Sequence, residues 1–369
     1  MDKRSVVFVI NTMNVGGVEK ALIGVLKEFL KDGWDVHVAM LKVGGGFMPY
    51  LPNEIHVHQI EGYEDSIRLM HTPLRQTIAR ELRSLRLLSC VRYSVCLLQQ
   101  KFMSSSTLLY RRGFKAIPKF SDTEYDLAVA FAGPDAFIDT YVDKKINAKE
   151  KWGWIHFDVT QFGVDKGIID SVYRNYTRIN VVSKEARKKF CDKFPPLASK
   201  TTLRPNIVDK ESIMSLAKEN QPMLSVDGRR VVLTVGRVSK EKGQYLALEA
   251  IKVLLSREVS DFVWIFVGNG TDMERCKQFV ENNSLGDYAV FVGSKANPYP
   301  YMKQADLYVQ PSMHEGFCIT LAEAKLFGMP IITTDFTGAV EQLETYNKAS
   351  IVPYNAENLA DAVQCYLHE

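Results

Sequence analysis

Apolar and polar positions divide the chain into two successive rounds of short apolar runs and amphipathic segments. Runs rich in Val, Ile and Phe that are apolar at nearly every position are typical of central strands in a parallel sheet. Strands are predicted at 5–10, 34–41, 55–60, 125–132, 151–155 and 178–182, then at 230–235, 262–267, 289–293 and 307–309. Helical patterns lie between them, among them 18–30, 184–191, 319–328 and 358–367. The alternation predicts an α/β protein built from two doubly wound parts.

The length of the chain agrees with this division. Its 369 residues are more than one ordinary domain contains and suit two domains. The polar stretch from Glu219 to Gly228 is the predicted hinge region. We therefore predict one domain over residues 1–208, interrupted by an insert at 64–119, and a second domain over 209–369.

Cysteine usage and hydropathy predict a cytosolic protein. The six cysteines have no metal-ligand spacing, so we interpret them as reduced thiols. The N-terminus runs from Lys3-Arg4 directly into a strand pattern, without the cleavage pattern of a signal peptide. No apolar run reaches the roughly 18 residues of a membrane-spanning helix.

Positive charge is concentrated in the insert at 64–119. This block holds eleven Lys or Arg against three Asp or Glu, although the net charge of the chain is only +3. Its arginines alternate with leucines in the pattern of one amphipathic helix with a cationic face, formed by Arg75, Arg80, Arg83, Arg86 and Arg92. An ordinary solvated helix is one interpretation. Because aromatic residues are sparse here, an anionic membrane surface is a better functional partner than nucleic acid, which we do not expect to bind.

The segment that follows the strand at 307–309 is the first candidate site. The backbone N–H groups of Gly316, Phe317, Cys318 and Ile319 would face outward from a helix N-terminus, which favours an anion such as phosphate. Glu315 lies on the loop and Glu323 about one turn into the helix, with seven residues between them. Carboxylates accept hydrogen bonds from sugar hydroxyls. The alternative is a surface loop with a solvated helix glutamate.

Further candidates lie at the ends of other predicted strands. Arg237 and Lys242 are five residues apart in a strand-to-helix loop, a spacing that suits a diphosphate or a solvated charge cluster. Loops beginning at Gly268 and Gly293 could approach a nucleotide base through backbone groups. Gly16 and Gly17 open the first helix and allow close approach of a phosphate, although the G-x-G-x-x-G dinucleotide fingerprint is absent.

His156 and Ser183 complete the set of candidates. His156 follows a strand, and substrates bind at the carboxyl ends of parallel strands, although a lone histidine is more often structural. Ser183 precedes a helical pattern and is a plausible N-cap.

Together these motifs resemble those of the group 1 glycosyltransferases, a retaining family of the GT-B fold. The resemblance rests on the E-x7-E pair Glu315 and Glu323, on the G-R-x4-K motif with Arg237 and Lys242, and on their order and separation. Cys318 stands where the family usually has glycine. The resemblance implies two Rossmann-like domains, the N-terminal one binding the acceptor and the C-terminal one a nucleotide-diphosphate sugar. It covers nearly the whole chain and is weakest in the insert.

The resemblance also assigns roles to the candidate residues. Arg237, Lys242 and the N–H groups of residues 316–319 would stabilise the leaving diphosphate, Glu315 would bind hydroxyls of the donor sugar, and Glu323 the ribose. His156 would contact the transferred sugar or the acceptor hydroxyl, Ser183 would lie near the acceptor, and Gly16, Gly17, Gly268 and Gly293 near the donor. No Asp-x-Asp triplet is present, so we expect no metal and no other cofactor.

The acceptor and its location are the last expectations. The basic insert favours a lipid-linked acceptor in cell-surface polysaccharide or glycolipid synthesis, with the enzyme peripheral at the inner face of the membrane. A nucleotide-sugar 2-epimerase and a non-catalytic partner subunit share the fold and remain alternatives, whereas a dinucleotide dehydrogenase is disfavoured. Relatives continue with one or two more helices, so we expect a truncated or abbreviated C-terminus.

Overall fold

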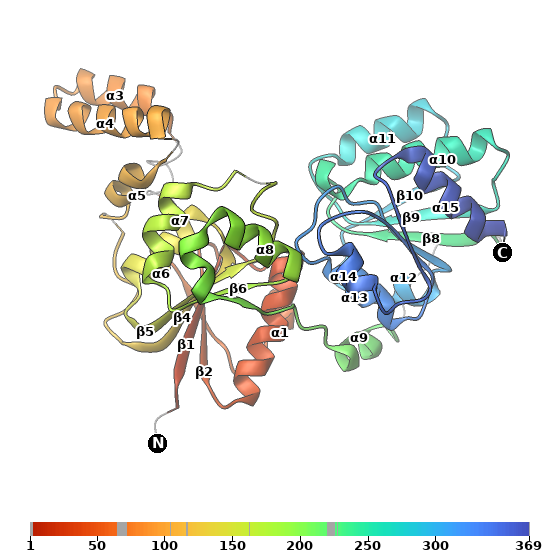
Figure 1. Cartoon of the computed structure of the whole chain (residues 1–369), viewed down its shortest axis with the longest axis horizontal. Helices are drawn as coiled ribbons and strands as arrows, with labels where there is room; N and C mark the ends of the chain where they lie inside the picture. The colour runs from red at the N-terminus through yellow and green to blue at the C-terminus, as the bar shows by residue number, and fades with distance from the viewer. Residues whose placement is uncertain are drawn as a thin grey trace. The chain divides into compact units, whose positions relative to one another are not determined.

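The computed structural model describes residues 3–64, 72–103, 105–115, 117–161, 163–219, 226 and 228–368, and divides into two compact units. Figure 1 shows the course of the chain through both. The first unit consists of residues 1–14, 25–182 and 187–204, and the second of 15–24, 183–186 and 205–369. Most of the predicted hinge, at 220–225 and 227, lies outside the described residues.

The first unit is built on a parallel sheet of seven strands in the order β3-β2-β1-β4-β5-β6-β7. Phe8, Phe131 and Trp154 are fully buried in its core. The strands are β1 (Ser5–Ile10), β2 (Asp35–Met40), β3 (His56–Gln59), β4 (Tyr125–Gly133), β5 (Ala148–Ile155), β6 (Arg178–Val181) and β7 (Thr201–Leu203). Its helices include α1 (Gly17–Lys31), α5 (Thr107–Gly113), α6 (Ala136–Lys145), α7 (Lys166–Val172) and α8 (Lys184–Lys193), with α1 and α8 shared between the units.

The second unit has a parallel sheet of six strands in the order β10-β9-β8-β11-β12-β13. The strands are β8 (Arg230–Val235), β9 (Phe262–Val267), β10 (Ala289–Gly293), β11 (Leu307–Gln310), β12 (Ile331–Thr334) and β13 (Ala349–Val352). The helices are α9 (Lys210–Leu216), α10 (Gln244–Ser256), α11 (Met273–Asn282), α12 (Tyr299–Gln304), α13 (Ile319–Leu326), α14 (Ala339–Leu343) and α15 (Ala356–His368). Four short 3-10 turns occur in the chain, at Met48–Tyr50, Tyr173–Asn175, Pro195–Lys200 and Lys240–Lys242, within the part that the structure describes.

Both faces of the second sheet are covered, which explains why a central strand such as β9 is apolar throughout. Val232 and Trp264 point to a core with α10 and α15, whereas their neighbours Val231 and Val263 point to a core with α12 and α13. Side chains that alternate between two apolar layers leave no polar face. The two doubly wound units confirm the predicted α/β fold class.

The strand order places a site in this second unit. β8 lies between β9 and β11, so the chain leaves it on one side and returns on the other. Ligands of doubly wound sheets bind beyond the carboxyl ends of the strands at such a switch point. The loops after β8 and β11 both open there, and they contain the predicted motifs.

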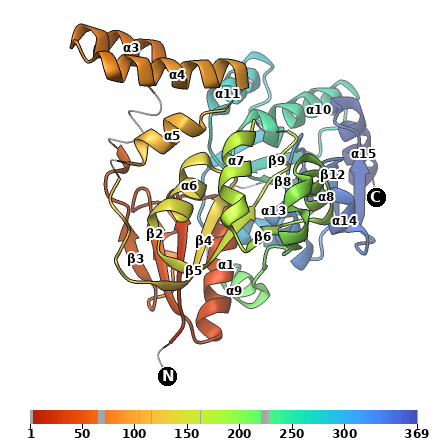
Figure 2. The ribbon, with the colours of Figure 1, turned by 60° about the vertical axis from the view of Figure 1, so that its left-hand side comes forward.

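The single amphipathic helix predicted between Arg75 and Arg92 is wrong. The structure has two helices, α3 (Leu74–Arg83) and α4 (Leu87–Met103), which lie side by side in Figures 1 and 2. The break occurs at Leu85, which takes the left-handed conformation with φ +55°. The N–H of Arg86 then donates to the carbonyl of Glu81 at 3.0 Å, the bond that closes a helix C-terminus.

Candidate active site

The loops after β8 and β11 are held together by backbone contacts. The N–H of Met313 donates to the carbonyl of Glu241 at 2.8 Å. Gly243 has φ +72°, and a Cβ atom there would lie 1.8 Å from the carbonyl oxygen of Pro311. Only glycine permits this approach. The contact fixes the loop that carries Lys242 against the loop that carries Glu315.

Lys242 and Glu315 form an ion pair at this junction. Lys242 Nζ donates to Glu315 Oε1 at 2.6 Å, and Ser312 Oγ donates to the same oxygen at 2.8 Å. Glu315 is buried and Lys242 is partly exposed. Desolvation lowers the pKa of Lys242, but the charge of Glu315 and the hydrogen bond outweigh it, so the pKa lies above its ordinary value. Lys242 is therefore a fixed cation.

A buried relay behind Glu315 was missed by the sequence analysis. Gln310 Nε2 donates to Ser312 Oγ at 2.7 Å, and Gln310 Oε1 accepts from Tyr308 at 2.6 Å and from Thr320 at 3.2 Å. Tyr308, Gln310 and Ser312 are buried, and each hydrogen bond fixes the orientation of the next group. One sequence feature could have indicated this relay: Gln310 is a polar residue at the end of an otherwise apolar strand. The relay positions Glu315.

Arg237 lies at the exposed side of the same group. Its side chain is exposed, and its positive charge lowers the pKa of Lys242, although less than Glu315 raises it. Gln244 Nε2 donates to the carbonyl of Arg237 at 3.0 Å, and Gln244 Oε1 accepts from the N–H of Ser239 at 3.3 Å. The buried amide of Gln244 thus fixes the backbone that presents Arg237.

Helix α13 begins at this group, with Cys318 as its N-cap. The thiol is buried, and burial raises its pKa, so it stays protonated. In the amide orientation that its neighbours favour, Gln342 accepts from the N–H of Cys318 at 3.1 Å. That N–H is consequently engaged. In the described part of the chain, the N–H groups of Gly316 and Phe317 donate to no backbone carbonyl.

Glu323 is buried in the second turn of α13, with 1% of its surface exposed. Its Oε1 accepts from the hydroxyl of Tyr299 at 3.0 Å. Its Oε2 is buried and has no hydrogen-bond partner among the described residues. A buried carboxylate oxygen without a donor is costly unless a ligand supplies one.

The loops after β9 and β10 join the same edge of the sheet. The N–H of Gly268 donates to the carbonyl of Gly293 at 2.9 Å, so that N–H is engaged within the protein. A Cβ atom at Gly268 would lie 1.8 Å from the carbonyl oxygen of Gly236, whereas one at Gly293 would meet nothing within 4 Å. Gly268 therefore allows the loop after β9 to pack closely against the loop after β8. The space beside Gly293 is open.

His156 lies in the first unit, directly after β5. Its Nε2 lies 2.6 Å from the carbonyl oxygen of Phe131. Because a carbonyl only accepts, Nε2 carries the proton and Nδ1 is left as an acceptor in the neutral ring. Desolvation lowers the pKa of His156 to about 4, opposed in part by this hydrogen bond. The ring is neutral at physiological pH.

Other candidates begin helices. Gly17 opens α1 as predicted, and a Cβ there would meet nothing within 4 Å, so the protein itself does not require glycine. At Gly16 a Cβ would meet the flexible carboxylate of Glu19. Ser183 Oγ accepts from the N–H of Ala186 at 3.2 Å, which makes Ser183 an N-cap of α8.

The structure thus gathers Arg237, Lys242, Glu315, Glu323 and the start of α13 at one edge of the second sheet. His156 is not part of this group. Among the described residues no cluster of His, Cys, Asp or Glu is arranged to hold a metal ion. The group offers the cations Arg237 and Lys242, helix N–H groups and two buried carboxylates, of which Glu323 is also paired with Lys20 Nζ at 2.6 Å. This combination suits a ligand that has both phosphate and hydroxyl groups.

Comparison with known proteins gives this arrangement a family. Residues 217–369 match the model of the family described as "Glycosyl transferases group 1". This part of the chain is similar to that family, which confirms the predicted resemblance. The match includes Arg237, Lys242, Glu315 and Glu323.

Curated relatives and a solved structure agree with the match. The chain is 30% identical over 148 residues to the putative teichuronic acid biosynthesis glycosyltransferase TuaC of Bacillus subtilis, covering 38% of this chain and 34% of TuaC. It is 26% identical over 147 residues to the N,N'-diacetylbacillosaminyl-diphospho-undecaprenol alpha-1,3-N-acetylgalactosaminyltransferase of Campylobacter jejuni, covering 40% and 38%. These matches span little more than a third of each relative's length.

The structural likeness extends further along the chain. HepE of Anabaena, solved in complex with UDP and glucose, matches with a TM-score of 0.70 at 17% identity, covering 99% of this chain and 90% of HepE. An identity this low carries the fold alone. It confirms the predicted GT-B fold.

Proposed function

We propose that the protein is a retaining glycosyltransferase that moves a sugar from a nucleotide-diphosphate sugar to an acceptor hydroxyl. The observation that carries the proposal is the Lys242–Glu315 pair, held at the N-terminus of α13 and joined to the Gln310 relay. The fixed cation and the helix N–H groups suit the diphosphate, and the carboxylate beside them suits sugar hydroxyls.

In the proposed reaction the bond between the sugar C1 and the diphosphate oxygen breaks, and negative charge grows on that oxygen. Arg237, Lys242 and the N–H groups of Gly316 and Phe317 would stabilise this charge. The acceptor oxygen attacks from the same face, and the departing phosphate oxygen takes its proton. In this scheme no carboxylate acts as a nucleophile, because Glu315, held by Lys242 and Ser312, is assigned to sugar hydroxyls and Glu323 to the ribose.

The remaining contacts are assigned to the donor and acceptor. The unpartnered Oε2 of Glu323 would accept from a ribose hydroxyl, and Gly293 and Gly17 leave space for the donor. Neutral His156 of the first unit would accept from a hydroxyl of the sugar or acceptor through Nδ1, and Ser183 would lie near the acceptor. No metal or other cofactor is proposed.

For the acceptor we propose a lipid-linked saccharide of cell-surface polysaccharide or glycolipid synthesis. The named relatives support this, since one acts in teichuronic acid biosynthesis and the other on a diphospho-undecaprenol substrate. The enzyme would be cytoplasmic and peripheral at the inner membrane face, attracted by Arg75, Arg80, Arg83, Arg86 and Arg92. Within the described residues, no helix has the length and apolarity needed to cross a membrane.

A screen of nucleotide sugars by thermal shift tests the donor assignment. A donor at 100 times its dissociation constant stabilises the fold by about 2.7 kcal/mol, which gives a clear shift. NMR of the product formed with that donor should then show the anomeric configuration of the donor. Absence of a shift with every nucleotide sugar argues against the proposal, and formation of a donor epimer without acceptor identifies an epimerase instead.

A further inference from the structure

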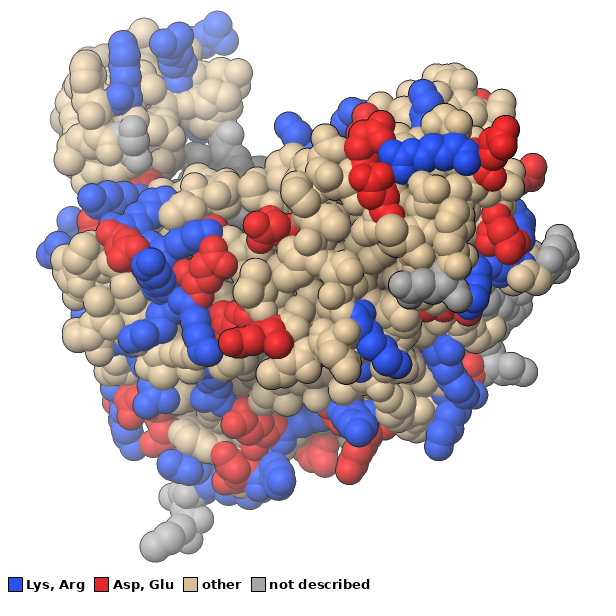
Figure 3. Space-filling model, turned by 45° about the vertical axis from the view of Figure 1, so that its right-hand side comes forward, with Lys and Arg blue, Asp and Glu red and all other residues tan. Residues whose placement is uncertain are grey.

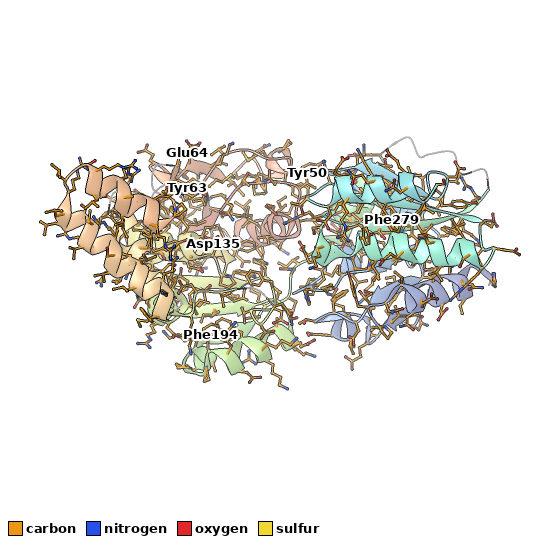
Figure 4. The ribbon with its side chains drawn as sticks, turned by 90° about the horizontal axis from the view of Figure 1, so that it is seen from above. Tyr50, Tyr63, Glu64, Asp135, Phe194 and Phe279 are labelled. Atoms are coloured by element: carbon orange, nitrogen blue, oxygen red, sulfur yellow. The ribbon has the colours of Figure 1, made fainter. Side chains whose placement is uncertain are left out.

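The insert forms a helical hairpin whose inner side packs against other residues of the protein. Between α3, α4 and α5 lies a small core of Leu74, Tyr93, Cys96 and Leu109. The guanidinium of Arg112 lies 4.1 Å from the ring centroid of Tyr93. Seen from above in Figure 4, α3 and α4 lie side by side and their outer side chains project outward. The inner side of α4 is therefore occupied by the protein itself.

The outer side of α4 is an apolar stripe without a protein partner. Leu88, Val91, Val95, Leu98 and Phe102 follow one another at intervals of three and four residues, which places them on one face of a helix. Their exposed fractions are 77%, 62%, 47%, 53% and 75%. An exposed apolar stripe this long marks a surface that meets another apolar phase.

Cations border this stripe on both sides. Arg92 lies four residues after Leu88 and three before Val95, at one edge, and Lys101 lies three residues after Leu98, at the other. α4 has no Asp or Glu. The face of the hairpin visible at the upper left of Figure 3 is largely tan, with Lys and Arg among the tan atoms. Long cationic side chains beside an apolar stripe are typical of helices lying at an anionic bilayer surface.

The turn between the helices adds an independent observation. Leu85 is 84% exposed although it has the left-handed conformation that normally selects glycine. Neighbouring Leu82 and Leu87 are also exposed, at 55% and 62%. An exposed leucine gains little packing within the protein and carries backbone strain. If the tip of the hairpin enters lipid, the apolar side chain of Leu85 is removed from water.

We propose that the α3–α4 hairpin inserts into the interface of an anionic lipid bilayer, with the stripe of α4 and the Leu85 tip buried among acyl chains. The proposal builds on the peripheral location proposed above but assigns the lasting attachment to apolar insertion rather than to charge alone. A second copy of this chain suits the stripe less well. Pairing two α4 helices would bring Arg92 and Lys101 of both copies together without an acidic side chain on either helix.

Vesicle co-sedimentation of the full chain separates insertion from charge. The vesicles contain equal phosphatidylglycerol and phosphatidylcholine, and binding is measured at physiological salt and at about 1 M salt, where the Debye length is only about 3 Å. Wild type should stay bound in high salt. The triple variant Leu88→Ser, Val91→Ser, Val95→Ser should lose at least about tenfold in partitioning at high salt. Replacing Arg75, Arg80, Arg83 and Arg86 by Ser should mainly weaken binding at physiological salt.

Two further variants distinguish insertion from a structural role. Leu85→Gly relieves the left-handed strain, so the thermal midpoint should stay equal or rise while partitioning falls. The single variant Val91→Ser is tested with Val340→Ser as its matched control, because Val91 is 62% exposed and Val340, in α14, is 61% exposed. Val340→Ser should partition like wild type.

Several outcomes overturn the proposal. If the apolar variants partition like wild type at high salt, charge alone holds the protein at the membrane. If sedimentation in lipid-free solution reveals a dimer that Val91→Ser dissociates, the stripe pairs two copies of the chain. Thermal shift with nucleotide sugars is measured in every variant, so failure of membrane insertion and failure of the sugar-transfer proposal give different results.

Discussion

Lys242 Nζ and Glu315 Oε1 lie 2.6 Å apart, although the two residues are 73 positions apart in the chain. The pair brings the loop after β8 to the loop after β11, and the glycine contact between Gly243 and Pro311 keeps both loops in place. Since Ser312 donates to the same carboxylate oxygen, the pair is held from two directions. A donor would meet a cation and a carboxylate whose positions are fixed before it binds.

Removing either cation should slow sugar transfer more than it weakens donor binding. We expect Arg237→Ala and Lys242→Ala each to lower turnover by roughly 100-fold, about 2.7 kcal/mol, because their interaction strengthens as charge grows on the leaving diphosphate. Turnover comes from product formation and donor affinity from titration calorimetry. Arg230→Ala is a matched control, since Arg230 begins β8 at the opposite edge of the sheet. Turnover within threefold of wild type in both variants contradicts the assignment.

Activity should survive removal of divalent metal ions. Arg237, Lys242 and the start of α13 would supply the positive charge that a metal supplies in other transferases. The measurement is initial rate after incubation with EDTA and desalting. A rate that falls with chelation and returns with Mg²⁺ or Mn²⁺ rejects this prediction.

Stability should fall as the pH drops below about 6.5, and His156 should carry part of the loss. Its folded pKa of about 4 lies below the ordinary value of 6.5, so the unfolded state binds the proton first. The stabilisation is complete above pH 6.5 and is lost as the pH falls toward 4, by roughly 2 kcal/mol at pH 5. Desolvation lowers the pKa of His58 too, helped by the charges of His37 and His56.

Urea unfolding of wild type and His156→Gln at pH 7, 6 and 5 measures this effect. Glutamine can still donate to the carbonyl of Phe131 but does not titrate, so the variant should lose less stability between pH 7 and 5. His58→Gln, tested in parallel, measures how much of the pH dependence of stability comes from His58 and its neighbours His37 and His56. Equal pH dependence in wild type and His156→Gln contradicts the assignment of a buried neutral ring.

Sequence pattern was sufficient for most strands of both sheets and for the motifs at their carboxyl edges, whereas the edge strands β7 and β13 were not predicted. Apolar runs such as Phe262–Val267 identify strands because both faces of each sheet are buried, and parallel strands end at a common edge. The predicted Glu315 and Lys242 meet there for that reason. Their direct pairing could not be predicted from the sequence. It depends on the close approach of Gly243 to Pro311, and these two residues are far apart in the chain.

The helix break and the relay were missed for different physical reasons. The arginines and leucines from Arg75 to Arg92 keep a helical period through the break, and Leu85 gives no signal of the kind that glycine gives. Gln310 and Ser312 are common residues whose meaning arises only when strand β11 brings them beneath Glu315. Long-range hydrogen bonds of this kind depend on tertiary geometry rather than on local pattern.

Gly243 should be among the least replaceable glycines of the second unit. In Gly243→Ala the new Cβ would lie 1.8 Å from the carbonyl oxygen of Pro311, so the two loops must move apart, and the φ of +72° adds strain. We expect a loss of more than about 3 kcal/mol in unfolding free energy, measured by urea denaturation. Gly293→Ala has a similar φ of +77° but open space, so it should lose only about 1 kcal/mol, the cost of the left-handed conformation. Gly286→Ala, with open space and no positive φ, should be neutral. If Gly243→Ala and Gly293→Ala lose the same stability, backbone conformation alone accounts for both, and the contact between the Lys242 and Glu315 loops is not what holds the site together.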